Sequence, residues 1–201
     1  HGCNRFKPIY IDRIKDGILN PVTKIDVLKE TATTAVLDAN DGMGMVASKK
    51  AMDMCIEKAR KYGMGMVAVR NSSHYGIAGY YTKMACDAGF IGISTTNSES
   101  IAVHTNSRQA ILGSNPIAFA MPAEPYPFWF DAATTVVPKG KLEVYNKESK
   151  PLPDAWAIGA NGETSTDASH VLDCIADKTG SNGGIYVLGG KTEETGSHKG
   201  Y

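Results

Sequence analysis

An alternation of strand-like and helix-like segments is the feature of this sequence that most constrains its fold. Residues 33–40 are rich in Thr, Val, Leu and Ala and are typical of a strand, and residues 45–62 place apolar side chains every three to four positions, as an amphipathic helix does. The same order then repeats, with a buried strand over 65–70, a helix over 76–88 and a second buried strand over 90–97. Strands that alternate with helices predict an α/β fold.

Glycines and short polar runs mark the ends of these segments. Gly63 and Gly89 are expected to stop the two helices, and residues 38–42 are expected to form the turn after the first strand. The isoleucine spacing in residues 11–18 predicts a short helix that ends near Gly17. Weaker patterns predict two more strands, at 117–121 and 129–133, and two more helices, at 132–147 and 168–176. Residues 161–168 are expected to form turns, and residues 179–184 a flexible loop.

Composition narrows the class of partner. Of the 201 residues, 42% are apolar and 21% are charged, as in globular proteins, and 21 Lys plus Arg balance 21 Asp plus Glu. A net charge of zero gives no electrostatic reason to expect nucleic acid or an anionic membrane as a partner. We therefore expect small molecules or neutral protein surfaces as partners. No apolar run approaches the roughly 18 residues that span a bilayer, so we expect a cytoplasmic protein. The start at His1 and the polar end are what we expect of a piece of a longer chain.

The cysteines and histidines do not form a metal-binding pattern. Four cysteines, at positions 3, 55, 86 and 174, make no CxxC pair, so we expect reduced and mostly buried thiols. His104 and His170 have no partner at metal-ligand spacing, and we predict no metal site. The sequence also lacks the GxSxG and Walker motifs, which argues against hydrolases and NTPases.

A glycine-rich turn precedes the first long predicted helix. Gly42, Gly44 and Ala47 match the GxGxxA pattern, which would point the helix N-terminus at the pyrophosphate of a dinucleotide. However, the segment about 20 residues later carries Arg70 where that fingerprint has an acidic residue. A glycine-rich turn that only caps the helix is the commoner outcome of such a pattern.

The segment 70–81 carries more chemical information. Polar side chains at 71–74 directly follow a predicted strand, and ligands of α/β sheets bind at strand ends. His74 is therefore a candidate general acid or base, with a neighbouring hydroxyl to orient its ring. The alternative is structural, with Ser72 or Ser73 capping the next helix and His74 held by ordinary hydrogen bonds.

Other polar candidates are less distinctive. The turns 113–116 and 130–134 lie beside apolar strands, and either can be ordinary turn chemistry. His1 and Arg5 combine a titratable group with a permanent cation, and the run 198–201 places a lysine beside glycine, which suits a phosphate or a carboxylate. A frayed terminus and a solvated lysine are the structural alternatives.

Taken in order, many of these segments resemble one family of enzymes. They are HGxxR (1–5), DGMGM (41–45), the run 50–81, AGFIGISTTNS (88–98), LGSNPIAFAMP (112–122), FWFDAAT (128–134), KGK (139–141), PLPDAWAI (151–158), GETSTD (162–167) and GSHKGY (196–201). In order and spacing they are similar to the malate/L-lactate dehydrogenase family. This is the non-Rossmann group of NAD(P)-dependent L-2-hydroxyacid dehydrogenases, which also includes ureidoglycolate, sulfolactate and diketogulonate enzymes.

The resemblance implies an architecture of two parts. A non-Rossmann α/β sandwich that binds NAD(P) would cover residues 31–190, and a helical domain built from the chain ends would include 1–30 and the return segment 191–201. The resemblance also implies a homodimer with its active site near the subunit contact. It argues against the GxGxxA interpretation, because this family does not bind its dinucleotide through a Rossmann turn.

The resemblance also implies roles for individual residues. His1 matches a proton donor to the substrate carbonyl, Arg5 an arginine that holds the substrate carboxylate, and His74 a histidine near the nicotinamide that is the base in some members. Lys141 falls where some members have a polar catalytic partner. The positions that resemble the cofactor shell are Ser98, Asn115, Asp131, Ala132, Ala133, His198 and Lys199.

These matches predict an oxidoreductase that moves a hydride between NAD or NADP and a small L-2-hydroxy or 2-oxo acid of the malate or lactate type. Two alternatives stay open. The same scaffold could act on ureidoglycolate, sulfolactate or a cyclic imino acid, or the chain could be an inactive cofactor-binding fragment. The choice between NAD and NADP also stays open, because Arg70 after a strand suits either a 2′-phosphate or a plain surface position.

Overall fold

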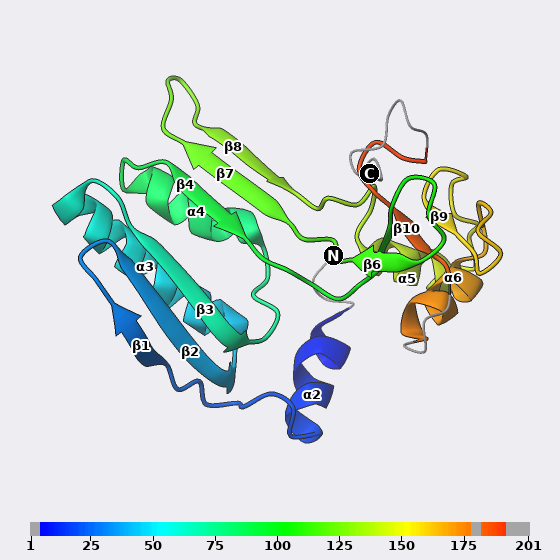
Figure 1. Cartoon of the computed structure of the whole chain (residues 1–201), viewed down its shortest axis with the longest axis horizontal. Coiled ribbons are helices and arrows are strands. Elements are labelled where there is room, and N and C mark those ends of the chain that lie inside the picture. Colours follow the sequence, from blue (N-terminus) through cyan, green and yellow to red (C-terminus); the bar gives the residue numbers. More distant parts are fainter. Residues whose placement is uncertain (1–4, 178–181, 192–201) are drawn as a thin grey trace. The chain divides into compact units, whose positions relative to one another are not determined.

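The chain folds into two compact units. A computed structural model describes residues 5–177 and 182–191. The first unit comprises the described residues of Gly2–Ser94 and Ala118–Asp131, and the second comprises those of Thr95–Ile117 and Ala132–Tyr201. Each unit combines helices with strands (Figure 1), which confirms the predicted α/β class.

The first unit begins with two short consecutive helices. A π-helix, η1 (Lys7–Ile11), runs into α2 (Asp12–Lys15), and the chain then turns at Gly17, which has a left-handed φ of 71°. Tyr10 packs with Leu19 in a small buried cluster. The short helix predicted before Gly17 is confirmed, and its first part has the wider π turn.

Three strands form the first sheet of this unit, in the order β1-β2-β3. Strand β1 (Asp26–Glu30) is antiparallel to β2 (Thr34–Gly42), which is parallel to β3 (Met66–Ser72). Helix α3 (Gly44–Tyr62) joins β2 to β3, packs against both and ends at the left-handed Gly63. The sequence pattern does not predict β1, because its charged and apolar residues do not alternate regularly.

The end of β2 departs from the predicted turn. The strand continues through Gly42 with a register irregularity after Asp38, and Asn40 and Asp41 have φ values of 49° and 56°. The Asp38 Oδ1 atom accepts a hydrogen bond from the Asn40 backbone N–H at 2.9 Å. Asn and Asp tolerate this left-handed backbone, so the turn chemistry of residues 38–42 forms a bulge within the strand.

A second sheet in this unit has the order β4-β7-β8, and helix α4 precedes it in the chain. These elements are α4 (Ala78–Asp87), β4 (Gly92–Thr95), β7 (Ile117–Met121) and β8 (Phe128–Ala132). Strand β7 has the predicted bounds, and β8 begins one residue before the predicted strand at 129–133.

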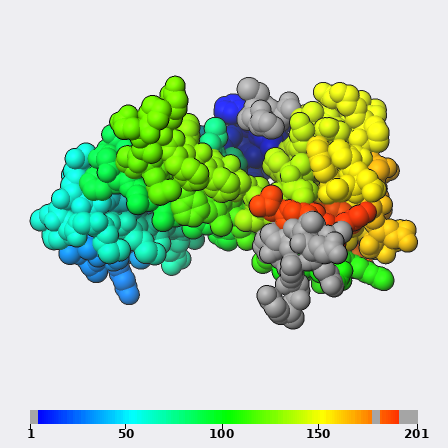
Figure 2. All heavy atoms as spheres, turned by 90° about the horizontal axis from the view of Figure 1, so that it is seen from above, coloured from blue at the N-terminus to red at the C-terminus, as the bar shows by residue number. Residues whose placement is uncertain are grey.

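The strands of this unit have one exposed apolar face. Met66 is 62% exposed, Ile93 58% and Phe130 42%, whereas Ala118 and Ala120 are buried on the other side of β7. The hairpin of β7 and β8, green in Figure 2, lies at the surface of the unit. The expectation that the strands predicted at 65–70 and 90–97 are buried is therefore wrong for one of their faces.

The second unit is built on a four-stranded sheet with the order β6-β5-β10-β9. Its elements are β5 (Ala102–Val103), β6 (Ala110–Leu112), α5 (Lys139–Lys147), β9 (Ala157–Ile158), α6 (Ala168–Ala176) and β10 (Gly184–Tyr186). Leu142, Val171 and Ile185 lie fully buried in its core. Helix α6 has the predicted bounds, but α5 begins later than the predicted helix at 132–147, because Pro138 is its N-cap and the Val136 backbone N–H bonds to β10.

Cys55, Cys86 and Cys174 are in no disulfide, and the last two are buried, as the sequence predicts; Cys3 lies outside the described residues. Within 5–177 and 182–191, no helix has the length and apolar character to cross a membrane. Those same residues contain no group of three His, Cys, Asp or Glu side chains arranged to hold a metal ion.

Candidate active site

The loop between β3 and α4 is fixed against the start of α3. The Ser73 hydroxyl donates to the Gly42 carbonyl at 3.0 Å and accepts from the Gly44 N–H at 3.0 Å. A Cβ atom at Gly44 would lie 2.1 Å from the Ser73 carbonyl oxygen and 2.7 Å from that of His74. Only glycine permits this approach, which holds the His74 backbone against the helix start.

This packing gives the GxGxxA segment a structural role. The backbone of residues 73–74 lies against the helix start, where a Rossmann turn would receive a pyrophosphate. Gly42 has no free space either, because a Cβ atom there would lie 2.6 Å from Thr23 Cγ2. The geometry therefore supports the alternative in which these glycines serve the start of the helix.

The imidazole of His74 has two partners on one nitrogen. Tyr10 Oη lies 2.7 Å from His74 Nδ1, and the Gly76 backbone N–H donates to the same atom at 3.3 Å. The two rings meet edge to face, with centroids 5.9 Å apart. Because an Nδ1 that accepts from a backbone N–H carries no proton, these hydrogen bonds assign the proton of neutral His74 to Nε2.

Burial, and after it two arginines, shift the pKa values of this pair. Burial of its ring lowers the pKa of His74, and the positive charges of Arg5 and Arg13 lower it further, although the residue keeps an exposed surface. Burial also raises the pKa of the Tyr10 hydroxyl, against an opposing effect of the same arginines. A neutral proton-exchanging group beside two permanent cations suits a substrate that is an acid.

The start of α4 is held by β8. The N-cap residue of α4 makes no side-chain hydrogen bond, and the Asp131 Oδ2 atom instead accepts from the Gly79 N–H at 2.6 Å. The structural alternative in which Ser72 or Ser73 caps this helix is therefore wrong, because its N-cap is Ile77. Asp131, expected in the cofactor shell, has a carboxylate that complements the positive end of the α4 dipole.

The second unit contains a compact cluster of neutral polar groups. The Ser98 N–H donates to Asn115 Oδ1 at 2.9 Å, and the Asn115 N–H donates to Ser98 Oγ at 3.3 Å. The Ser114 hydroxyl lies 3.2 Å from that of Ser98, and the Ser114 carbonyl accepts from the Thr134 N–H at 2.8 Å. A Cβ atom at Gly113 would lie 2.3 Å from Ser98 Oγ, so this glycine permits the cluster to close.

The two lysines of the KGK segment have different neighbours. Lys141 Nζ lies 5.8 Å from the centre of the Tyr145 ring, a cation–π contact along α5. Lys139, at the first position of the helix, pairs with the Glu99 carboxylate at 3.3 Å. Glu99 directly follows Ser98, so the described contacts tie Lys139, rather than Lys141, to the polar cluster.

The remaining candidate residues lie at the end of β8 or outside the described residues. Ala132 and Ala133 are half-buried at the end of β8. His1, His198 and Lys199 lie outside the described residues. Among the described candidates, the first unit holds Arg5, His74 and Asp131, and the second holds Ser98, Asn115, Ala132, Ala133 and Lys141.

The sequence model of the malate/L-lactate dehydrogenases matches residues 1–201, the whole chain. The chain belongs to the malate/L-lactate dehydrogenase family. The resemblance found in the motifs is thereby confirmed.

Named relatives and a solved structure of the family are similar over most or all of the chain. Malate dehydrogenase of Pyrococcus abyssi is 46% identical over 201 residues, which are 100% of this chain and 53% of the relative. L-Sulfolactate dehydrogenase of Methanocaldococcus jannaschii is 42% identical over 185 residues, which are 91% of this chain and 53% of the relative. The crystal structure of malate dehydrogenase from Entamoeba histolytica, at 45% identity, superposes with a TM-score of 0.92 over 100% of this chain and 55% of that one. The chain thus spans about half the length of the relatives it matches.

Sequence reasoning missed two residues around His74. Tyr10 and Arg13 lie three residues apart in the predicted first helix, a spacing that places two side chains on one face. That spacing was the available signal, but it does not identify a partner 64 positions away in the chain. The family motif singles out His1 and Arg5 nearby, and it is the fold that adds Tyr10 and Arg13.

Proposed function

We propose that the complete protein is an oxidoreductase that transfers a hydride between NAD(P) and a small L-2-hydroxy or 2-oxo acid of the malate or lactate type. The observation that carries this proposal is the 2.7 Å contact between Tyr10 and His74, with Arg5 and Arg13 as the charges acting on both. The names of the relatives, malate and L-sulfolactate dehydrogenases, support the same reaction class.

In this proposal the residues of the first unit bind the acid and move a proton. The Arg5 guanidinium binds the carboxylate next to the reacting carbon, since a planar cation with paired donors matches a carboxylate. In the reductive direction the Nε2–H proton of His74 passes to the substrate oxygen while Nδ1 takes up the proton of the Tyr10 hydroxyl, and oxidation reverses both transfers. The same contact with Tyr10 fixes the ring of His74. His1 remains the proposed proton donor to the carbonyl, and Lys141 the proposed polar partner, on the resemblance alone.

We propose the neutral polar cluster of the second unit as part of the cofactor site. The hydroxyl and amide groups of Ser98 and Asn115 suit the ribose and carboxamide of a nicotinamide nucleotide. The small side chains of Ala132 and Ala133 leave the backbone approachable. A bound nicotinamide supplies or accepts the hydride. Asp131, His198 and Lys199 complete the proposed shell on the resemblance.

The cofactor proposal covers both NAD and NADP. Arg70, the cation that suggests a 2′-phosphate in the sequence, already pairs with Asp38 at 3.3 Å. Because Asp38 already neutralises part of the Arg70 charge, the structure gives less reason than the sequence alone to expect a 2′-phosphate at Arg70. We further propose the family division into 1–30, 31–190 and 191–201 and a homodimer on the resemblance, and a cytoplasmic location on the sequence pattern alone.

The decisive experiment uses the full-length protein. Absorbance in the nicotinamide band is followed with NADH and NADPH against pyruvate, oxaloacetate, sulfopyruvate, a cyclic imino acid and, in the oxidative direction, ureidoglycolate. We expect the highest kcat/KM with a 2-oxo acid and a strong loss of rate in His74→Ala. Absence of turnover with every acid would overturn the proposal, and a full rate in His74→Ala would remove His74 from the mechanism.

The alternative of an inactive binding fragment rests on the share of the relatives that this chain covers, 53% of the Pyrococcus abyssi enzyme. Its test uses the 201-residue chain itself. A ligand that binds only the native state must raise the melting temperature, so NADH and NADPH are added during thermal unfolding. Stabilisation without turnover would favour the binding fragment over the enzyme for this chain.

A further inference from the structure

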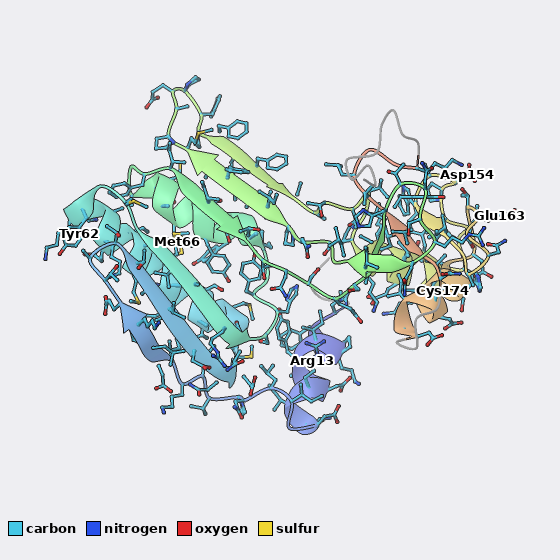
Figure 3. All side chains as sticks on the ribbon, in the orientation of Figure 1. Arg13, Tyr62, Met66, Asp154, Glu163 and Cys174 are labelled. Atoms are coloured by element: carbon cyan, nitrogen blue, oxygen red, sulfur yellow. The ribbon has the colours of Figure 1, made fainter. Side chains whose placement is uncertain are left out.

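Arg13 is a cation on α2, the helix that directly continues η1, which carries Tyr10. Arg13 (Figure 3) follows Tyr10 by three residues, and the backbone of Ile11 and Asp12 between them is α-helical, so the two side chains lie on adjacent sides of the continuous helix. The residue is exposed. Tyr10 in turn touches His74 at 2.7 Å, which places Arg13 one side chain away from the proposed proton-transfer group.

The carboxylate next to Arg13 in the sequence has another partner. Asp12 binds Lys7 Nζ at 2.8 Å. In the part of the chain that the structure describes, no carboxylate lies within ion-pair distance of the Arg13 guanidinium. The cation is thus available to a ligand from solution.

The charges that act on the pair formed by Tyr10 and His74 are all positive. Arg5 and Arg13 act on both side chains, and no described carboxylate opposes them. One arginine is sufficient for a monocarboxylate such as pyruvate. Two arginines around one proton-exchanging group match a substrate with two anionic groups.

We propose that Arg13 determines substrate specificity by binding the second anionic group of a dianionic 2-hydroxy or 2-oxo acid, while Arg5 binds the carboxylate next to the reacting carbon. This inference rests on the proposed function. The second group can be a carboxylate or a sulfonate, because both present several oxygens to a guanidinium, and the test below separates them.

The direct test compares three substrates in the full-length protein. Arg13→Met keeps an unbranched side chain and removes the charge, and kcat/KM is measured with NADH or NADPH for oxaloacetate, sulfopyruvate and pyruvate. Losing a charge-assisted hydrogen bond should lower kcat/KM for the dianion that the site accepts by about 10- to 100-fold. The value for pyruvate should stay within about 2-fold, since pyruvate has no second anion for Arg13 to bind.

Two control variants separate a specific contact from general charge. Arg13→Lys should recover part of the loss, because it restores the cation without the planar paired donors. Lys15→Met removes a cation from the same helix and should leave all three substrates unchanged. An equal loss with pyruvate and the dianions, or no loss with either dianion, would overturn the role of Arg13.

A binding measurement distinguishes failure of this inference from failure of the proposed function. Thermal stabilisation by tartronate, a dianion, and by oxamate, a monoanion, is compared in wild type and Arg13→Met. We expect the variant to lose the tartronate effect and keep the oxamate effect. If wild type turns over no acid, the proposed function fails. The difference between tartronate and oxamate stabilisation then shows by itself whether Arg13 binds the second anionic group. If it turns over acids but the variant shows no discrimination, only the inference about Arg13 fails.

Discussion

Tyr10 Oη lies 2.7 Å from His74 Nδ1, and this hydrogen bond joins residues 64 positions apart in the sequence. Tyr10 comes from the π-helix η1, and His74 from the loop that the start of α3 holds in place. A π turn is rare and shifts the direction of the side chains that follow it, and Tyr10 lies within this one. The Gly76 N–H donates to the same Nδ1 atom, so two hydrogen bonds together fix the orientation of the His74 ring.

Removing the Tyr10 hydroxyl should reduce activity more than stability. In the full-length protein, Tyr10→Phe keeps the buried ring but frees His74 Nδ1, and we expect kcat to fall about 10-fold, with a loss of about 1 kcal/mol in unfolding free energy. Steady-state kinetics and urea unfolding measure the two effects. Tyr80→Phe, which removes a hydroxyl from an exposed tyrosine of α4, is the matched control. An unchanged kcat in Tyr10→Phe would show that the hydrogen bond does not position His74.

The lowered pKa of His74 predicts a pH dependence of stability. An unfolded histidine has a pKa of about 6.5, so below that pH the unfolded chain takes up a proton more readily than the folded one. The contribution of His74 is therefore complete above about pH 6.5 and is lost as the pH falls through the lower folded value. His74→Gln should remove this part of the dependence. Melting temperatures between about pH 5 and 8 test it, and identical profiles for the two proteins would contradict it.

The glycine at the start of α3 should be irreplaceable for steric reasons. Gly44→Ala brings a methyl group to 2.1 Å from the Ser73 carbonyl oxygen, so either the loop or the helix must move. We expect a loss of about 3 kcal/mol in unfolding free energy and a displaced His74. Ser73→Ala removes the two hydrogen bonds without adding bulk and should cost about 1 kcal/mol. Urea unfolding ranks the two, and an equal or smaller loss in Gly44→Ala would show that the contact is relaxed.

The sequence predicts the regular parts of this fold better than its site. Helix α3 follows from 3.6-residue periodicity and the stop signal of Gly63, and α6 follows from a weaker helical pattern. The predicted bounds of both agree with the structure to within one residue. Strand β1 is missed because its five residues have no alternating pattern, and β2 extends through the expected turn because Asn40 and Asp41 fit a left-handed bulge. Local patterns of this kind carry no information on which face of a strand is covered.

The candidate site residues also differ in how far the sequence alone predicts them. His74 is predictable because polar residues after a strand point to a strand-end site. Its partner Tyr10 is not, since a contact across 64 positions depends on the packing of two elements. For Asp131 the position is marked by a family motif, but its contact is not. The motif does not reveal that the carboxylate accepts a hydrogen bond from the start of α4.

Asp131 offers the sharpest separation of a structural role from a cofactor role. Asp131→Ala leaves the Gly79 N–H without its 2.6 Å acceptor and should lower the unfolding free energy by about 1–2 kcal/mol even in the absence of nucleotide. Asp131→Asn keeps an acceptor oxygen but not the charge, so it should recover most of this stability. Urea unfolding is measured without NADH and again with it. If Asp131→Ala is as stable as wild type without nucleotide and loses only the stabilisation by NADH, the carboxylate serves the cofactor alone and the helix cap contributes nothing measurable.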